Sequence, residues 1–203
     1  MGAARRTQAE RRAATTRKLV DATIATLVEL GYGGTTVQEV CARAGVSQGG
    51  LFRHFATVEQ LVASAGEDIG RRLVQRYRRE LAVRGRRDDP MVALRLLRAA
   101  SRSPLAQAWF ELVVASRTQA GLRRALEPVF RRHYAEIVAL ARELWPAVAL
   151  RLGPAFDVVV DTVVAAFDGE SVRRFVVQAP ALEAKRLVLL ADAMQRATTH
   201  RSP

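Results

Sequence analysis

Apolar residues recur at three- and four-residue spacing along most of the chain, and no stretch shows convincing strand alternation. The first apolar stripe runs from Leu19 to Leu30 and is ended by Gly31 and the pair Gly33-Gly34. We therefore predict an all-α protein. Helices are expected over residues 19–30, 37–44, 48–56, 58–83, 91–97, 105–113, 122–144, 156–177 and 182–194.

The stretch Thr36–Gln60 holds two short predicted helices and the start of a third. Thr36-Val-Gln-Glu39 and Thr57-Val-Glu-Gln60 both have capping-box spacing, in which the first side chain accepts from an early backbone N–H and the fourth reaches back. Between them, Gly45 is suited to the left-handed residue that ends one helix, and Ser47 to the N-cap of the next. These helix start and stop signals predict a helix-turn-helix.

The second short helix is expected to end near Ala56 and to be about two turns long, too short to be stable alone. Its apolar side carries Leu51, Phe52 and Phe55. The opposite side carries Gly49, Gly50, Arg53 and His54.

Adjacent glycines near a helix start cost roughly 1 kcal/mol each relative to alanine, so a compensating role is expected. Because the two glycines carry no side chains, the backbone at these positions can approach a polyanion closely. Nearby polar side chains are Ser47, Gln48, Arg53 and His54. Helix N-termini bind phosphate, glutamine can pair with adenine, and arginine with guanine. A loop containing a weak helix is the alternative interpretation.

Composition narrows the classes of protein. The chain has 203 residues, of which 49% are hydrophobic, which is enough for a substantial core as one domain or two small ones. A net charge of +12 indicates an acidic partner. The single Cys41 excludes a disulfide framework and is expected to be a small buried hydrophobe. No apolar run approaches the ~20 residues of a membrane span, and we expect a cytoplasmic protein without a membrane partner.

The segment GVSQGGLFRHFATVEQLV, preceded by LVELGYGGTTVQEVCARA, resembles the signature of the TetR family of transcriptional regulators. The resemblance covers roughly the first 65 residues. It implies that the helix beginning at Thr36 supports the recognition helix, and that Phe52 and His54 occupy an aromatic-x-His position that contacts phosphate. Two positions depart from the family pattern, because Phe52 replaces a common tyrosine and Val58 a common lysine. The predicted DNA-binding residues are Thr36, Ser47, Gln48, Gly49, Gly50, Phe52, Arg53 and His54.

We expect a DNA-binding domain over residues 1–64 and a helical effector-binding and dimerisation domain over 65–203. The basic segment Met1–Lys18 is either a solvated, partly disordered terminus or an arm that adds phosphate or minor-groove contacts. The helix from Val58 should connect the two domains, with a solvated face of arginines, and the run Arg84–Pro90 is expected to form a loop. A second nucleic-acid surface is the alternative role of these arginines.

The last two predicted helices are apolar around nearly their whole circumference, as in Val158-Val-Val160 and Leu187-Val-Leu-Leu190. Such helices must be covered on several sides, and a second subunit is a plausible neighbour. The resemblance implies the same twofold dimer, with a four-helix bundle at its interface. Two recognition helices about 34–36 Å apart would meet successive major-groove faces, so a palindromic double-stranded operator is expected.

A small-molecule effector could be bound among mainly apolar helices by a few polar groups. The candidate lining residues are Trp109, Phe110, Phe130, His133, Tyr134, Asp161 and Phe167. Ordinary core packing is the alternative for the aromatic residues and His133. Arg98, Arg102 and Arg117 would favour an anionic ligand if they point inward.

No P-loop, GxSxG, HExxH or CxxC motif occurs, and the three histidines lack metal-ligand spacing. We therefore expect no enzyme, metal or cofactor, although a small all-helical enzyme using Asp161 and His133 stays open. A DNA-packaging protein without sequence specificity is a second alternative. The preferred hypothesis is a homodimeric, ligand-responsive repressor that an effector releases from its operator.

Overall fold

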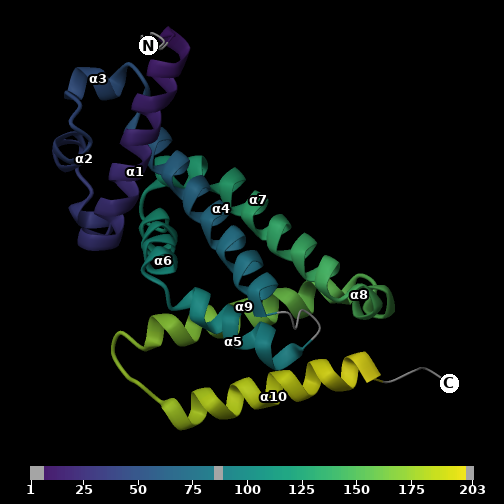
Figure 1. Ribbon diagram of the computed structural model, residues 1–203. Helices are drawn as coiled ribbons and strands as arrows, with labels where there is room; N and C mark the ends of the chain where they lie inside the picture. Colours follow the sequence, from purple (N-terminus) through teal and green to yellow (C-terminus); the bar gives the residue numbers. More distant parts are fainter. Residues whose placement is uncertain (1–6, 85–88, 200–203) are drawn as a thin grey trace. The chain divides into compact units, whose positions relative to one another are not determined.

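The computed structural model describes residues 7–84 and 89–199, and this part of the chain forms ten helices and no strands (Figure 1). The all-α prediction is therefore confirmed. The helices are α1 (Gln8–Gly34), α2 (Val37–Ala44), α3 (Gln48–Phe52), α4 (Val58–Arg84), α5 (Pro90–Ser101), α6 (Pro104–Ser116), α7 (Ala120–Leu144), α8 (Pro146–Leu152), α9 (Ala155–Arg173) and α10 (Pro180–Thr199).

The chain divides into two compact units. Unit 1 holds the described residues up to Gly70 together with Ala108–Arg131. Unit 2 holds Arg71–Gln107 together with the described residues from Arg132 onward. The boundaries fall inside α4, α6 and α7, so each of these helices contributes residues to both units.

The core of unit 1 contains an apolar cluster shared by α1, α2, the start of α4 and residues Ser47–Phe55, which we call the α3 segment. Its buried members are Leu19, Ala22, Val40, Cys41, Leu51, Phe55 and Leu61. Burial raises the pKa of the Cys41 thiol, which fits the prediction of a small buried hydrophobe. The short α3 is thus stabilised by its neighbours, because a helix of this length cannot hold itself in water.

Helix α1 begins earlier than predicted. Thr7 and Glu10 form a complete capping box, and α1 is continuous from Gln8 through the basic residues Arg11, Arg12, Arg17 and Lys18. A partly disordered terminus is therefore wrong for residues 8–18, while residues 1–6 lie outside the described part. At the other end, Gly31 (φ 67°, ψ −177°) bends the chain within α1, and helical structure continues to Gly34.

Two other expectations about the helices differ from the structure. Helix α8 was not predicted, whereas α7 runs through Pro128 as the single expected helix. Helix α9 ends at Arg173, and the following residues form a turn in which Val177 N–H donates to Arg173 O. The apolar pattern there continued to suggest a helix, but Val176 is 88% exposed, so within this chain no core holds that stretch helical.

The predicted loop Arg84–Pro90 is shorter than expected at both ends. Arg84 closes α4, Asp89 caps α5 through the N–H groups of Met91 and Val92, and Pro90 is the first residue of α5. Residues 85–88 lie outside the described part. Proline suits the first helical turn because its missing N–H would have no helical partner there.

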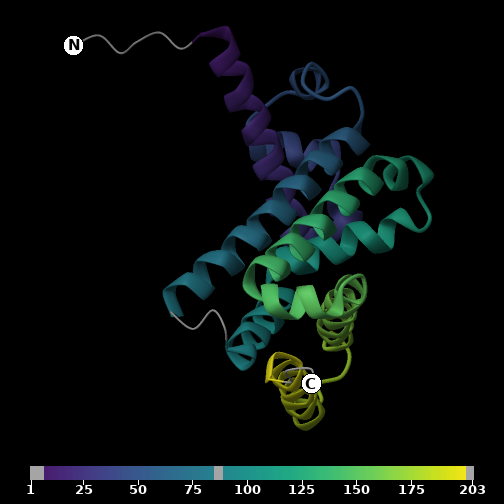
Figure 2. The same ribbon diagram turned by 90° about the vertical axis from the view of Figure 1, so that its right-hand side faces the viewer.

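In unit 2, α5 lies against both α9 and α10 (Figures 1 and 2). Phe167 of α9, Leu94 of α5 and Leu187 and Ala191 of α10 form one buried apolar cluster. A second cluster joins Leu81, Ala93 and Leu96 with the partly buried Tyr77, Trp145 and others. The Tyr77 hydroxyl donates to Ala93 O (3.1 Å), and burial raises the pKa of that phenol.

Beside the apolar cluster, buried carboxylates connect the same three helices. Arg102, the residue that caps the end of α5, donates through Nη2 to Glu170 Oε1 of α9 (2.5 Å) and to Glu183 Oε2 of α10 (2.8 Å). Arg186 donates to Glu170, and Arg174 donates to both oxygens of Glu183 (2.8 and 2.7 Å). We call Arg102, Glu170, Arg174, Glu183 and Arg186 the ionic cluster.

The two carboxylates of the ionic cluster are nearly inaccessible, with side-chain exposures of 1% for Glu170 and 8% for Glu183. Burial pushes the pKa of Glu183 up, but hydrogen bonds from Arg174 and the Ala179 N–H, and the charges of Arg102 and Arg174, outweigh burial and lower it. Glu183 is therefore held as a carboxylate, which keeps α10 joined to α5 and to the end of α9.

Candidate nucleic-acid interface

Helix α2 begins and ends as its sequence indicates. Thr36 Oγ1 accepts from the Glu39 N–H (3.1 Å), and Gly45 takes the left-handed conformation (φ 64°) that ends the helix. The predicted capping box is only half formed, because the Thr36 N–H donates to Gly34 O (3.0 Å) and not to Glu39. The backbone turn before α2 supplies the acceptor that the glutamate would have provided.

The second predicted capping box is displaced by one residue. Thr57 Oγ1 accepts from the Gln60 N–H (3.2 Å), while Gln60 Oε1 accepts from the N–H of Ala56 (3.0 Å) instead of Thr57. The start of α4 and the turn after α3 are thereby tied together, which restricts the chain that leaves the recognition helix.

Helix α3 is the predicted recognition helix, and its assigned length is five residues. Ser47 Oγ accepts from the Gly50 N–H (3.1 Å), as expected for an N-cap. The end predicted near Ala56 is wrong, because the helix stops at Phe52 and Leu51 O accepts from both His54 N–H (2.9 Å) and Phe55 N–H (3.0 Å). The bond from the His54 N–H spans three residues and not four, so the last turn is tighter than an α-helical one.

The packed side of the α3 segment contains fewer aromatic residues than predicted. Leu51 is 0% and Phe55 7% exposed, but Phe52 is 47% exposed and does not belong to the packed face. Leu51 and Phe52 are successive residues of one helix, so their side chains point about 100° apart around its axis, and only that of Leu51 faces the core. The Phe52 ring is therefore accessible to a partner.

The predicted DNA-binding residues lie on one short segment plus the start of α2. Thr36, Ser47, Gln48, Gly49, Phe52 and Arg53 are exposed, and Gly50 and His54 are partly buried. The two glycines are not equivalent. A Cβ on Gly49 would meet nothing within 4 Å, whereas one on Gly50 would lie 2.9 Å from Val46 Cγ1. An alanine at position 50 would therefore have to displace Val46, whereas Gly49 leaves backbone open to a partner.

Two contacts near this surface were not predicted. Thr16 Oγ1 of α1 lies 3.0 Å from His54 Nδ1, which joins the basic part of α1 to the end of the α3 segment. Arg43 of α2 donates to both carboxylate oxygens of Glu29 (2.8 and 2.7 Å) and lowers the pKa of that acid. No short-range pattern marks either pair, because their partners are 38 and 14 residues apart.

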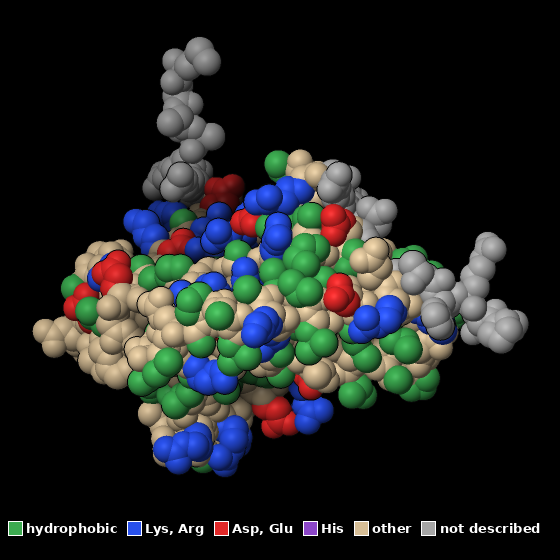
Figure 3. Space-filling view, turned by 90° about the horizontal axis from the view of Figure 1, so that it is seen from below, with side chains coloured by type: hydrophobic (Ala, Val, Ile, Leu, Met, Phe, Trp, Pro, Cys, Tyr) green, Lys and Arg blue, Asp and Glu red, His purple; other side chains and the backbone are tan. Residues whose placement is uncertain are grey.

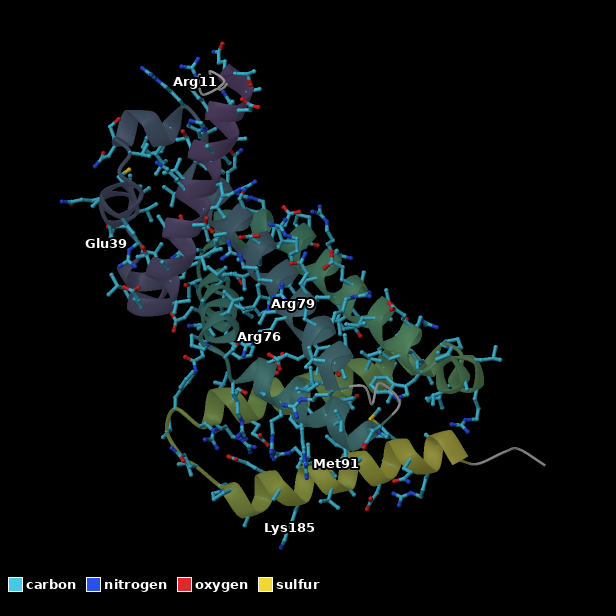
Figure 4. The ribbon with its side chains drawn as sticks, in the orientation of Figure 1. Arg11, Glu39, Arg76, Arg79, Met91 and Lys185 are labelled. Carbon is cyan, nitrogen blue, oxygen red and sulfur yellow. The ribbon has the colours of Figure 1, made fainter. Side chains whose placement is uncertain are left out.

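The basic turns of α1 add positive charge to the same unit. Arg11, Arg12, Arg17 and Lys18 are exposed, and Arg11 projects from the first turns of α1 in Figure 4. Exposed arginines also follow α4, where Arg76 and Arg79 are labelled in Figure 4. Arg76 pairs with Glu80 (2.8 Å) and Arg78 with Glu143 (2.8 Å), as expected of a solvated helical face.

The candidate effector residues occupy separate places in the two units. In unit 1, the Trp109 and Phe130 rings stack with centroids 4.8 Å apart and an interplanar angle of 20°, and Phe110 is partly buried. In unit 2, burial lowers the pKa of His133 to about 4. Phe167 is fully buried in the apolar cluster between α5, α9 and α10.

Tyr134 and Asp161 are brought together on α7 and α9. The Tyr134 hydroxyl donates to Asp157 O (3.1 Å), and its pKa is raised by burial first and by Asp161 and Asp157 second. Asp161 itself is exposed. Of the arginines considered for an anionic ligand, Arg102 is held by the ionic cluster, Arg98 donates to Glu183 O (3.4 Å), and Arg117 is exposed.

No helix in the described part of the chain is long and apolar enough to cross a bilayer. Likewise, residues 7–84 and 89–199 contain no cluster of three or more His, Cys, Asp or Glu side chains that could hold a metal ion.

Residues 19–65 match the family model of the bacterial regulatory proteins, tetR family. An HTH-type transcriptional regulator of Mycobacterium tuberculosis is 33% identical over 186 residues, covering 91% of this chain and 95% of the relative. Among solved structures, a putative TetR-family transcriptional regulator from Rhodococcus sp. has a TM-score of 0.68 at 20% identity, covering 91% of this chain and 98% of that one. The multidrug binding protein EbrR complexed with ethidium has a TM-score of 0.65 at 20% identity, covering 90% and 98%.

These similarities agree with the helix-turn-helix of α2 and α3 and with the helical remainder of the chain. The relative with 33% identity extends over both units, so the relationship is not confined to the DNA-binding motif. The chain belongs to the TetR family of transcriptional regulators.

Proposed function

We propose that this protein is a cytoplasmic, homodimeric repressor that binds a palindromic operator and is released by a small-molecule effector. The observation that carries the proposal is the composition of the exposed side of the α3 segment. Ser47, Gln48, Gly49 and Arg53 lie there together, next to a packed side made of Leu51 and Phe55. A rigidly packed helix with hydrogen-bonding groups and bare backbone outward suits insertion into a major groove.

In this proposal, residues 1–64 form the DNA-binding domain and residues 65–203 bind the effector and the second subunit. Gln48 and Arg53 contact base edges or nearby phosphates, and Ser47, Gly49 and Thr36 bring backbone and hydroxyl groups to the phosphates. The exposed cations of α1 increase affinity for any duplex, because each neutralised phosphate releases counterions. Base contacts on α3 supply the sequence preference.

Large apolar side chains on the last two helices are exposed in a single copy of the chain, and this exposure supports the proposal of a dimer. On α9 these are Val158, Val159 and Val172, and on α10 they are Leu182, Val188 and Leu189. Viewed from below Figure 1, the face where α10 lies carries extended areas of hydrophobic side chains (Figure 3). Pairing these faces with a second copy would remove them from water and place two recognition helices in one complex.

An effector could act on the DNA-binding segment through contacts inside unit 1. The Tyr32 hydroxyl donates to Gln119 Oε1 (2.6 Å), and the Tyr32 N–H donates to Glu111 Oε2 (3.1 Å), so the end of α1 is tied to α6 and to the turn before α7. The stacked rings lie on α6 (Trp109) and on α7 (Phe130). A tenfold loss of operator affinity requires only about 1.4 kcal/mol of preference for the non-binding state.

The chemical class of effector is open to direct screening. EbrR, which shares the fold, is described as a multidrug binding protein and was crystallised with ethidium. Flat aromatic cations are therefore useful first probes against the Trp109–Phe130 stack. The remaining candidate residues Phe110, His133, Tyr134, Asp161 and Phe167 are proposed to shape the same domain, with Phe167 acting through packing.

The decisive experiment is selection of bound duplexes from a random library by the full-length protein. Enrichment of an inverted repeat is expected, because a twofold dimer presents two identical recognition helices. Enrichment of a single half-site would contradict the dimer, and no enrichment would contradict sequence-specific control.

The net charge of +12 is the observation that favours the alternative, DNA packaging without sequence preference. Both functions predict affinity that falls steeply with salt. They differ in discrimination, because a packaging protein binds the enriched inverted repeat and a scrambled duplex equally well, whereas a repressor prefers the repeat. Competition between the two duplexes at constant salt distinguishes them.

A further inference from the structure

The contact between Thr16 and His54 restricts where the histidine carries its proton. Thr16 Oγ1 donates to Arg12 O (3.0 Å), and the same oxygen lies 3.0 Å from His54 Nδ1. A threonine hydroxyl has one proton, and a carbonyl oxygen can only accept. Both hydrogen bonds exist together only if Nδ1 carries a hydrogen and donates to Thr16.

This arrangement sets the chemistry of the other ring nitrogen. With Nδ1 protonated, a neutral imidazole leaves Nε2 as an acceptor, and only the imidazolium form donates from both nitrogens. Phosphate oxygens are acceptors, so a neutral His54 held by Thr16 cannot donate a hydrogen bond to the DNA backbone.

We propose that Thr16 is a positioning residue that holds His54 with its hydrogen on Nδ1, so that contact with an operator phosphate requires uptake of one proton by each protomer. The added proton resides on Nε2 and is shared with a phosphate oxygen, while Nδ1 continues to donate to Thr16. The inference rests on the proposed function and deepens it by coupling operator binding to pH.

The charged residues of the two segments joined by this contact are Arg12 and Arg17 of α1, which flank Thr16, and Arg53, which precedes His54. All three are retained when Thr16 is substituted. A difference in pH dependence between wild type and a Thr16 variant therefore isolates the hydrogen bond to His54 and not the general charge of the surface.

The first test reads the tautomer in the free protein. Nitrogen-15 chemical shifts of the His54 ring, measured above pH 8, are expected to show a protonated Nδ1 and an unprotonated Nε2. Thr16→Val removes the acceptor and should move the hydrogen to Nε2, while Thr16→Ser should restore the wild-type pattern. A neutral ring protonated on Nε2 in wild type would overturn the proposal.

The second test measures affinity for the selected operator duplex between pH 6 and 8.5 at constant ionic strength. Where the free histidine is neutral, affinity should fall with rising pH by up to about tenfold per pH unit for each proton taken up, and so up to about a hundredfold for a dimer. His54→Gln, whose amide donates without titrating, should give a flatter profile.

Thr16→Val provides the sharper comparison, because its His54 can donate from Nε2 while neutral. Its profile should be flatter than that of wild type, and Thr16→Ser should restore the slope. Equal slopes in all four proteins would overturn the proposal, and would instead fit Nε2 accepting from a base amino group. If selection yields no operator, the proposed function fails, while the nitrogen shifts still decide the role of Thr16.

Discussion

The α3 segment of unit 1 and the α5–α9–α10 junction of unit 2 are both buried on one side, but by opposite chemistry. Leu51 and Phe55 hold the α3 segment by apolar packing, which makes few directional demands. At the junction, Arg102, Glu170 and Glu183 require their partners in place, because an unpaired buried charge is costly.

The difference relates to what each region presents. Apolar packing on one side of α3 leaves Ser47, Gln48 and Arg53 exposed for a partner. The charged groups of the ionic cluster instead bond to one another, and they fix how α10 lies against α5. We hypothesise that this geometric demand orients the apolar faces of α9 and α10 for the second subunit. Each unit contains one tryptophan, Trp109 in unit 1 and Trp145 in unit 2, so single-tryptophan variants can report on the two regions separately.

The largest predicted effect is that of Glu170→Ala. The substitution leaves Arg102 and Arg186 without their shared carboxylate in a buried site, and should cost about 3–5 kcal/mol of unfolding free energy. Urea unfolding monitored at Trp145 measures it, with the exposed Glu136→Ala of α7 as the charge-matched control. Equal stabilities of the two variants would show that the ionic cluster is energetically unimportant.

Leu51→Ala should destabilise unit 1 by about 2–5 kcal/mol, because it removes a fully buried side chain and leaves a cavity. Phe52→Ala at the neighbouring exposed position is the matched control and should change stability by about 1 kcal/mol or less. Unfolding monitored at Trp109 distinguishes them. A larger loss of stability for Phe52→Ala than for Leu51→Ala would show that Phe52 belongs to the packed face.

Asp168→Asn is predicted to stabilise unit 2 near neutral pH. Burial raises the pKa of Asp168 from 3.8 to about 6, with a hydrogen bond from Ser101 (2.9 Å) opposing the shift. The folded protein therefore binds the proton more tightly than the unfolded chain, and stability falls as pH rises from about 4 to 6.

At pH 7 the free energy of unfolding of Asp168→Asn should exceed that of the wild type by up to about 2 kcal/mol. Its decrease between pH 4 and 6 should be shallower than in the wild type. Thermal unfolding across that range measures both. Ser101→Ala is a useful companion, because loss of the donor should steepen the fall. An unchanged pH profile in Asp168→Asn would rule out this carboxyl as its source.

Arg53→Ala should weaken operator binding about tenfold while leaving folding intact, since it removes one exposed charged contact. Arg79→Ala removes the same charge from α4, outside the α3 segment, and should leave binding nearly unchanged. Binding measured at several salt concentrations compares them. Similar losses for both variants would favour the alternative of a second nucleic-acid surface on α4.

The smallest expected effect is on stability at the glycine pair. Gly49→Ala should stabilise α3 by up to about 1 kcal/mol, because its Cβ meets nothing and alanine favours helix, yet it should weaken operator binding by blocking backbone approach. Gly50→Ala should gain less or lose stability, because its Cβ would press on Val46. If Gly49→Ala binds operator normally, the exposed backbone there does not meet DNA.

Much of unit 1 could be predicted from the sequence because its signals are local. The N-caps Thr36 and Ser47 and the left-handed Gly45 act within a few residues of themselves, and they place α2, the turn and the start of α3. The same local signals explain why the family signature could be found in this stretch. The end of α3 was harder to predict, since the shared acceptor Leu51 O depends on how the following turn packs.

The sequence by itself determined the helical class, the helix-turn-helix and the buried state of Cys41, because periodicity and capping are properties of neighbouring residues. Only the tertiary structure decided that Phe52 is exposed, that Thr16 meets His54, and that Arg102 joins Glu170 and Glu183. The Arg102 partners are 68 and 81 residues away along the chain. Contacts of that kind leave no periodic trace, since they depend on how separate helices pack and not on the order of residues within any one of them.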